Sequence, residues 1–262
     1  MNVPLSAAER ILKSLAIETP DEIDLEVIAW RMGVAGIRYR RLDGCEARIV
    51  GRRGRAIVSV REGVRPARQR FSICHELGHW HHHRGQFLCC KSSDIGEGAK
   101  DVAQAKEAVA NRFASDLLLP PYLLRSIVSG MRSIETKTVE QAANTFQASL
   151  TATAIKLVQM VSTPSMLVCH TRLGKKWHFP GPSVPRKWSP KPEIDQASQG
   201  FSLLFQDRPN QPTAKRVGAH TWFDRREAER FDVWEQSFKT VEGEVLTVLT
   251  FKDQKMFGDD RG

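Results

Sequence analysis

Residues 75–79 are His-Glu-Leu-Gly-His, inside the run FSICHELGHW at positions 71–80. Side chains four positions apart lie on one face of an α-helix, so the imidazoles of His75 and His79 can reach one metal ion. Catalytic Zn²⁺ suits two imidazoles and a carboxylate, with a fourth position left for water. Glu76 follows the first histidine and can take a proton from that water. The motif therefore predicts a zinc helix over residues 71–82 with Glu76 as the general base.

The same motif can occur by chance on a helix that is only packed in a core. A third metal ligand would favour the zinc site over this alternative. Residues 105–118 show the helical period in their apolar positions, which are Ala110, Phe113, Ala114, Leu117 and Leu118. Glu107 lies three positions before Ala110 on the same face. A carboxylate is expensive to bury unless it is paired or binds a metal. We expect Glu107 to be the third zinc ligand; the alternative is a surface carboxylate at the edge of the apolar stripe.

Two longer motifs carry a family resemblance. Residues 70–79 fit R-F-x-x-x-H-E-L-G-H, and residues 107–120 fit E-x-x-A-N-x-F-A-x-x-L-L-x-P. Together they resemble the ImmA/IrrE zinc metallopeptidases over roughly residues 1–160. The resemblance implies that His75, His79 and Glu107 bind zinc and that Glu76 is the catalytic base. It also implies a substrate class: helix-turn-helix transcriptional repressors, whose cleavage induces stress or mobile-element genes.

Two further polar residues stand one helical turn from the ligands. His83 follows His79 by four positions, and Asn111 follows Glu107 by four. His83 is a candidate for supporting a ligand or contacting substrate, and its alternative is an ordinary polar helix end. Asn111 can hydrogen-bond a ligand and orient it. A helix–helix packing contact is the alternative for Asn111.

The positive charge of the chain is concentrated near the motif. The net charge is +9, and residues 38–70 hold eleven arginines against three acidic residues. Such an arginine block fits a nucleic acid or an acidic partner, or a solvated face of a small sheet. The support for nucleic acid is weak at this level. A protein substrate is the partner that the motifs favour.

Other features place the chain in the cytoplasm. No apolar run approaches the roughly 20 residues of a membrane span. The start of the chain shows no signal peptide, and five cysteines form no disulfide framework. We therefore expect a cytoplasmic protein with no membrane partner.

The elements along the chain predict an α+β fold in three parts. Residues 1–128 form a zincin-like metallopeptidase domain with a small sheet and the active-site helix. Residues 129–162 form a helical hairpin of helix-turn-helix-like spacing, and residues 163–262 form a small, mostly antiparallel α+β domain of unknown role. Within the first part we expect helices over 6–16, with Ser6 as N-cap, and 24–32. Residues 84–101 are expected to form a loop near the site mouth, and residues 254–262 a disordered end.

Strands over 45–50 and 56–60 form the predicted hairpin of the small sheet. We expect the substrate to bind as an extended strand along 56–60, because an edge strand exposes unpaired N–H and C=O groups.

Two classes of function fit these features. The first is a zinc endopeptidase that acts on a protein regulator. The second is a non-proteolytic zinc-containing regulator that binds DNA through the arginine block and the helices over 139–146 and 150–160. The second of these helices carries only one basic residue, Lys156, which is few for a recognition helix. Glu76 favours the enzyme, because a structural zinc site needs no base beside its first ligand.

Overall fold

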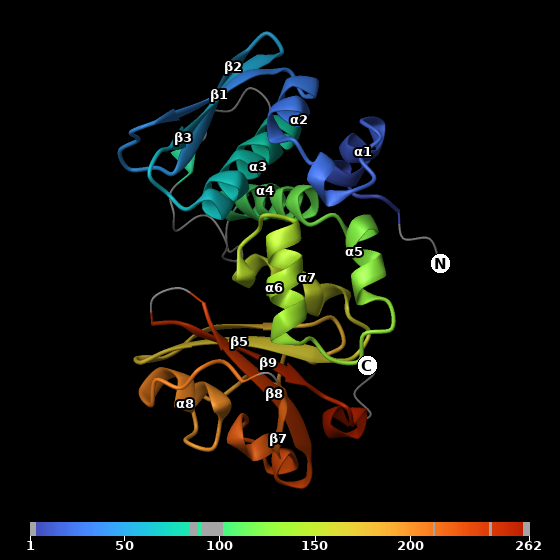
Figure 1. The fold of residues 1–262 in the computed structure, drawn as a ribbon, viewed down its shortest axis with the longest axis vertical. Helices are drawn as coiled ribbons and strands as arrows, with labels where there is room; N and C mark the ends of the chain where they lie inside the picture. The colour runs from blue at the N-terminus through green and yellow to red at the C-terminus, as the bar shows by residue number, and fades with distance from the viewer. Residues whose placement is uncertain (1–3, 84–88, 91–101, 212, 241–242, 259–262) are drawn as a thin grey trace. The chain divides into compact units, whose positions relative to one another are not determined.

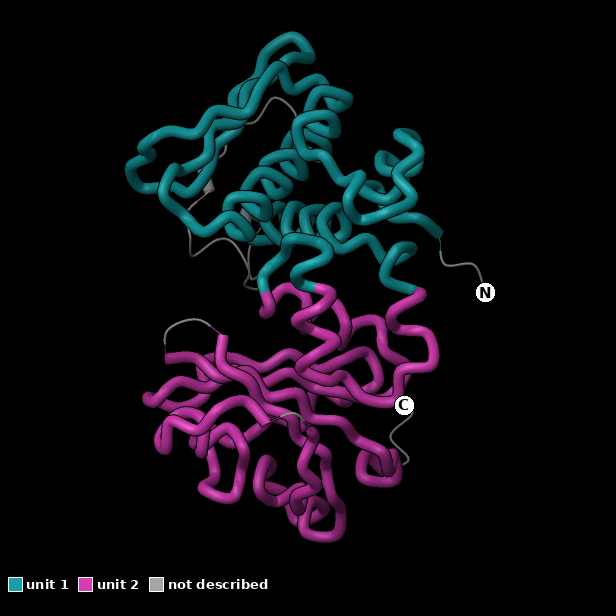
Figure 2. Tube along the Cα trace, viewed as in Figure 1, with its two compact units in different colours: residues 1–125, 143–149 teal, residues 126–142, 150–262 magenta. Residues whose placement is uncertain are grey.

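The computed structural model describes residues 4–83, 89–90, 102–211, 213–240 and 243–258. The chain has an α+β fold, as predicted, and divides into two compact units (Figure 2). Unit 1 comprises residues 1–125 and 143–149, and unit 2 comprises residues 126–142 and 150–262. The division into three domains at 128 and 162 stays a prediction. None of the described helices is long and apolar enough to cross a membrane.

Unit 1 combines helices with a small sheet (Figure 1). The helices are α1 (Ala7–Ser14), α2 (Leu25–Arg31), α3 (Pro66–His82), α4 (Val102–Leu118) and the start of α5 (Pro121–Val128). The first helix begins as its sequence predicts. The Ser6 hydroxyl accepts the N–H of Glu9, and the Glu9 carboxylate accepts the N–H of Ser6. This reciprocal pair is a capping box.

The sheet of unit 1 has four strands in the order β1-β3-β2-β4. They are β1 (Val34–Arg40), β2 (Ala47–Arg52), β3 (Arg55–Arg61) and the short β4 (Cys89–Cys90). Strands β2 and β3 form the predicted hairpin. Its two-residue turn, Arg53-Gly54, has φ of 53° and 80°, the pattern of a type I′ turn.

The expectation that residues 56–60 offer an exposed edge is wrong. Strand β1 pairs parallel to β3 on the side opposite β2, so β3 lies inside the sheet. A parallel neighbour that is distant in sequence leaves no local signal, which is why the hairpin looked like an edge. A substrate strand could pair only with β1 or with the part of β2 beyond Arg48, among the strands that the structure describes.

One buried tryptophan ties helix α3 to this sheet. The indole Nε1 of Trp80 donates to the carbonyl of Met32 at 2.9 Å. A Cβ added at Gly51 on β2 would lie 2.4 Å from the Trp80 ring. Glycine is therefore needed there for α3 to pack against β2 and β3, and this packing sets the position of the metal motif.

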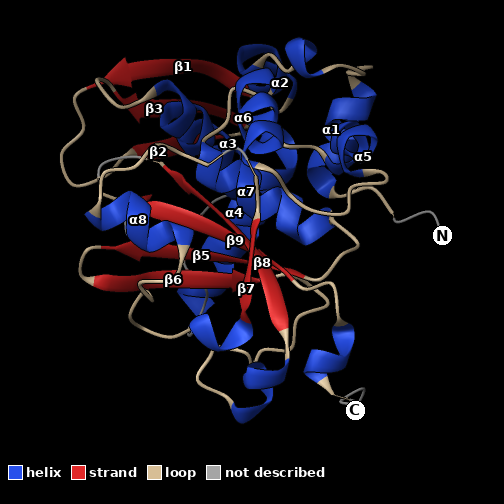
Figure 3. Cartoon of the chain, turned by 60° about the horizontal axis from the view of Figure 1, so that its bottom comes forward, coloured by secondary structure: helices blue, strands red, loops and turns tan. Residues whose placement is uncertain are grey.

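Unit 2 contains a five-stranded antiparallel sheet in the order β6-β5-β9-β8-β7 (Figure 3). Its strands are β5 (Ser165–Thr171), β6 (Gly174–Pro180), β7 (Lys215–Gly218), β8 (Asp232–Lys239) and β9 (Val245–Thr250). Its helices are α6 (Thr136–Thr145), whose last turn belongs to unit 1, α7 (Leu150–Met160) and α8 (Gln199–Phe205). The mostly antiparallel α+β architecture predicted for the C-terminal part is confirmed.

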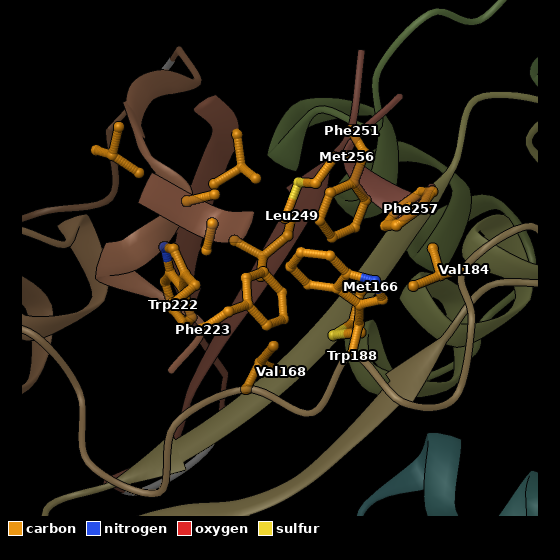
Figure 4. Packing of buried hydrophobic residues seen from close by; sticks show 14 residues of the cluster. Met166, Val168, Val184, Trp188, Trp222, Phe223, Leu249, Phe251, Met256 and Phe257 are labelled. Carbon is orange, nitrogen blue, oxygen red and sulfur yellow. The ribbon is translucent and has the colours of Figure 1, made fainter. Parts of the chain in front are cut away.

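Four 3-10 helices complete the described elements. They are η1 (Pro20–Glu22), η2 (Ala219–Thr221), η3 (Arg226–Arg230) and η4 (Gln254–Phe257). The last of them corrects a prediction. Met256 and Phe257 are buried in the aromatic core of unit 2, beside Trp188 and Phe251 (Figure 4). Residues 254–257 are therefore ordered by packing, while 259–262 lie outside the described residues, as does most of the expected loop 84–101.

The two helices of the predicted hairpin are present as α6 and α7. Helix α7 packs against β5 and buries Thr153, Leu157 and Lys156. Lys156 is 4% exposed. The second helix of the hairpin therefore presents no exposed basic side chain to a nucleic acid.

Candidate metal centre

Helix α3 carries the motif in its buried half. His75 and Glu76 are 0% exposed and His79 is 2% exposed. The helix starts with Pro66 at its first turn, where the missing N–H costs nothing, and His83 ends it as the C-cap. Cys74, the neighbour of the first histidine, is fully buried, in keeping with a core residue. Burial of three titratable side chains on one helix is costly unless something pairs them.

Helix α4 packs directly on α3 and supplies the third group. The contact centres on Gly78, where an added Cβ would lie 3.0 Å from the Ala110 Cα and 3.2 Å from the Phe113 Cβ. Gly78 thus permits an approach of the two helices that any larger residue would oppose. Its role was missed from sequence, although a glycine facing a small residue on the partner helix is the signal that could have revealed it. The close approach brings Glu107 to the histidines.

Three ligand-type atoms converge between the helices. The Nε2 atoms of His75 and His79 lie 3.0 Å apart. The Glu107 carboxylate places Oε2 3.0 Å from His75 Nε2 and Oε1 3.3 Å from His79 Nε2. Atoms that share a tetrahedral Zn²⁺ at about 2.0–2.1 Å lie about 3.3 Å from one another. The spacing therefore fits a single zinc ion, and this set is the metal-type cluster found among the described residues.

The charge of the Glu107 carboxylate also favours a cation among these atoms. Burial alone raises the pKa of Glu107, but hydrogen bonding with His75 and then His79 outweighs it and lowers the pKa to about 2. The carboxyl group is thus ionised at neutral pH. A proton can bridge only two of the three converging atoms, whereas a cation can bind all three. The donor set, two nitrogens and a carboxylate oxygen, fits Zn²⁺.

The two polar residues that follow the motifs by one helical turn, Asn111 and His83, both lie beside the motif histidines. The Asn111 Oδ1 is 3.0 Å from His75 Nδ1. When the amide oxygen accepts that N–H, the lone pair of a neutral His75 ring sits on Nε2 and faces the converging atoms. The Nδ1 of His83 lies 3.2 Å from the Nδ1 of His79. Each of the two histidines thus has a polar neighbour behind it.

Comparisons with known proteins show the family and the fold of the chain. Residues 21–158 match the peptidase M78 family model, described as an IrrE N-terminal-like domain. A solved structure of a Mycobacterium tuberculosis transcriptional regulator has a similar fold, with a TM-score of 0.60 and 15% sequence identity over 94% of this chain and 86% of that one. A search of curated proteins finds no match.

Proposed function

We propose that this chain, which belongs to the peptidase M78 family of IrrE N-terminal-like domains, is a zinc-dependent endopeptidase acting on a protein regulator. The observation that carries the proposal is the convergence of His75, His79 and Glu107 on one point. The buried Glu76, next to the first of them, supplies the group that a purely structural zinc site does not need.

The residues have distinct tasks in peptide hydrolysis. His75, His79 and Glu107 would hold Zn²⁺, which when bound polarises the scissile carbonyl and lowers the pKa of its water to about 7. Glu76 takes the proton from the attacking water and delivers it to the leaving amine nitrogen. Asn111 keeps the His75 ring in one orientation. We propose that His83 does the same for His79 or contacts the substrate.

The substrate we propose is a helix-turn-helix transcriptional repressor, whose cleavage would induce stress or mobile-element genes. This rests on the resemblance of the two motifs to the ImmA/IrrE peptidases. We also keep the three-part division at residues 128 and 162 as a proposal. In it the C-terminal domain, residues 163–262, has an unknown role.

The alternative is a non-proteolytic zinc protein that binds DNA through the helical hairpin and the arginine block. The buried position of Lys156 on α7 disfavours the hairpin as a reader of DNA. Nothing about α7 supplies the exposed basic side chains that a recognition helix needs.

The test replaces Glu76 with glutamine. Glu76→Gln removes the base, and general-base catalysis contributes about 10²- to 10⁴-fold to rate, so cleavage should fall by that factor. Zinc content, measured by mass spectrometry of the purified protein, should stay at one per chain because the three ligands remain. The assay offers a purified helix-turn-helix repressor as the substrate, and fragments are identified by mass spectrometry.

Glu26→Gln on the exposed face of α2 is the matched control, and it should cleave as the wild type does. Cleavage by Glu76→Gln at the wild-type rate would remove Glu76 as the base. Zinc-loaded protein that cleaves no repressor in any of these mixtures would favour the non-proteolytic alternative.

A further inference from the structure

The outer face of the sheet in unit 1 carries only one sign of charge. The three strands β1, β2 and β3 contain six arginines, no lysine and no acidic residue. The strand registers put all six on the same face: Arg38, Arg40, Arg48, Arg52, Arg55 and Arg61. We call this set the arginine face. It opposes the face that buries Ala56, Val58 and Val60.

The arginines form rows across the sheet. Arg38 and Arg48 both pair with Ser59, so one lies on each side of it. Arg40 is opposite Arg61, and Arg52 is opposite Arg55. Neighbouring strands lie about 4.8 Å apart and alternate residues about 6.7 Å apart along a strand. The result is a regular lattice of cations.

This face is open to solvent. Five of its arginines are exposed, and Arg61 is half-buried with its guanidinium donating to the carbonyl of Leu42. The other five form no salt bridge with any residue that the structure describes, while the nearby acids pair elsewhere: Glu46 with Arg68 and Glu62 with Arg41. The described helices α2 and α3 lie on the other side of the sheet (Figure 1). The repulsion among the arginines is therefore unrelieved by described acids.

We propose that the arginine face binds the phosphate backbone of double-stranded DNA. A guanidinium offers a planar pair of donors that matches a phosphate, and every cation on this face is a guanidinium. Protein–DNA interfaces are much more positively charged than protein–protein interfaces, which instead have an apolar or aromatic centre. Val50, 53% exposed, is the one exposed apolar side chain among the described residues of this face.

The composition of the face also selects the kind of nucleic acid. Proteins that bind single strands stack the bases on aromatic side chains. The register places Tyr39, the one aromatic residue of these strands, beside Val60 on the opposite face. Regular cations without a stacking platform fit a duplex backbone and give binding without sequence preference.

The inference goes beyond the proposed peptidase and does not depend on it, because the binding assay requires no cleavage. A peptidase with such a face would be concentrated on the molecule that carries DNA-bound regulators. Failure of DNA binding would leave the zinc site untouched, and failure of cleavage would leave the arginine face untouched.

The experiment measures binding of the full chain to a fluorescent 20-base-pair duplex of arbitrary sequence by anisotropy, from 50 to 200 mM salt. The test variant is Arg38→Gln/Arg48→Gln/Arg52→Gln. The matched control is Arg10→Gln/Arg31→Gln/Arg125→Gln, which removes three exposed arginines from helices of the same unit. Both triples change the net charge equally.

We expect the test triple to bind at least about tenfold more weakly at 50 mM salt. Its slope of log affinity against log salt should flatten by about 0.9 for each phosphate that the variant no longer neutralises. The control triple should stay within about twofold of the wild type. An Arg→Lys triple at the three test positions keeps the charge and should keep most of the slope, which guards against a folding artefact.

Three results would overturn the proposal. Equal weakening by the test and control triples would mean that net charge alone attracts the DNA. A single strand of the same length that binds more tightly than the duplex would contradict a backbone site without stacking. The third is displacement of the duplex by a 20-residue polyglutamate peptide whose concentration of negative charges is lower than that of the duplex. This result would point to an acidic protein partner instead.

Discussion

Each unit of this chain holds a glutamate against hydrogen-bonding partners, half-buried in the case of Glu107 and buried in the case of Glu235, and the two are held in opposite ways. In unit 1 the oxygens of Glu107 face two imidazole nitrogens at 3.0 and 3.3 Å, from a different helix. In unit 2 Glu235 is 0% exposed, and its oxygens accept the backbone N–H of Gln199 and, at 2.7 Å, the indole N–H of Trp222. Burial raises the pKa of Glu235, whereas the pKa of Glu107 falls to about 2.

The difference separates a ligand site from a structural one. The partners of Glu235 are neutral donors, so its hydrogen bonds are complete within the protein. The atoms nearest Glu107 are two imidazole nitrogens, each of which carries either a proton or a lone pair, so the same three groups can also bind a cation. A buried carboxylate therefore indicates a metal site only when its neighbours also have lone pairs to offer.

The largest effect should come from replacing Glu107. Glu107→Ala removes one of three ligands, and loss of even an outer hydrogen-bond partner costs about 10- to 100-fold in metal affinity, so we expect a decrease greater than about 100-fold. Zinc is measured by mass spectrometry after dialysis against a weak chelator. Glu235→Ala is the matched control and should keep one zinc per chain. Equal zinc in both variants would make the two glutamates alike and remove Glu107 from the ligand set.

The second prediction concerns Glu235, whose replacement should affect stability and not zinc binding. Glu235→Ala leaves the N–H groups of Gln199 and Trp222 buried without an acceptor, and each such group costs about 1–3 kcal/mol. We expect the free energy of unfolding of unit 2 to fall by about 2–6 kcal/mol, measured by urea titration of tryptophan fluorescence. An unchanged midpoint would show that Glu235 is not a structural residue.

The effect of Glu235→Ala on stability should depend on pH, and the sign of the pKa shift of Glu235 gives the direction. Burial raises the folded-state pKa of Glu235 above its ordinary value of 4.5, with the hydrogen bonds from Gln199 and Trp222 opposing. The folded state then holds the proton more tightly than the unfolded state, so this contribution to stability is present below pH 4.5 and is lost as pH rises through the folded pKa. The difference between wild type and Glu235→Ala should therefore be larger at about pH 4 than at about pH 8. A difference that grows with pH would contradict the raised pKa.

A third prediction concerns the residue behind the first ligand. Asn111→Ala removes the hydrogen bond with His75 Nδ1 and should lower zinc affinity by about 10- to 100-fold while leaving the three ligands in place. Asn144→Ala, on the exposed part of α6, is the control and should bind zinc normally. Wild-type affinity in Asn111→Ala would reduce Asn111 to a helix-packing residue.

The smallest effect should come from the glycine between the two helices. Gly78→Ala adds a methyl group 3.0 Å from the Ala110 Cα, so α3 and α4 must part by a few tenths of an ångström. Overpacking of this kind typically costs about 1–3 kcal/mol, and we expect the lower end together with weaker zinc binding. Gly36→Ala meets nothing within 4 Å and is the control. If both variants have the same melting temperature and bind zinc equally, the close approach at Gly78 is not what positions Glu107.

Local rules account for the parts of the fold that were predicted well. The capping box at Ser6, the hairpin at Arg53-Gly54 and the helix of the metal motif depend on residues within about four positions of one another. The residues of the candidate site follow the same logic, since His75 with His79 and Glu107 with Asn111 are one helical turn apart. Such patterns are visible in the chain because their partners are close in sequence.

The predictions that failed involved partners far along the chain. Strand β1 pairs with β3 although the whole of β2 lies between them in the sequence. This pairing places β3, which was expected at the edge, inside the sheet. Phe257 is ordered because it packs on Trp188 and Phe251, and nothing near residue 257 indicates that contact. A contact between distant residues depends on the closed fold, and no local periodicity encodes it.

The sequence by itself determined the chemistry of the candidate site: two imidazoles and a carboxylate at helical spacing, with a second carboxylate beside them. Only the tertiary structure decided that these groups meet, through a helix contact at Gly78 that brings atoms from α3 and α4 to within 3.0–3.3 Å. It also decided that six arginines, scattered over 24 positions from Arg38 to Arg61, share one face, because strand register sets which side chains point the same way. The sequence specifies the residue types, but the packing of helices and strands decides which of these residues meet in space.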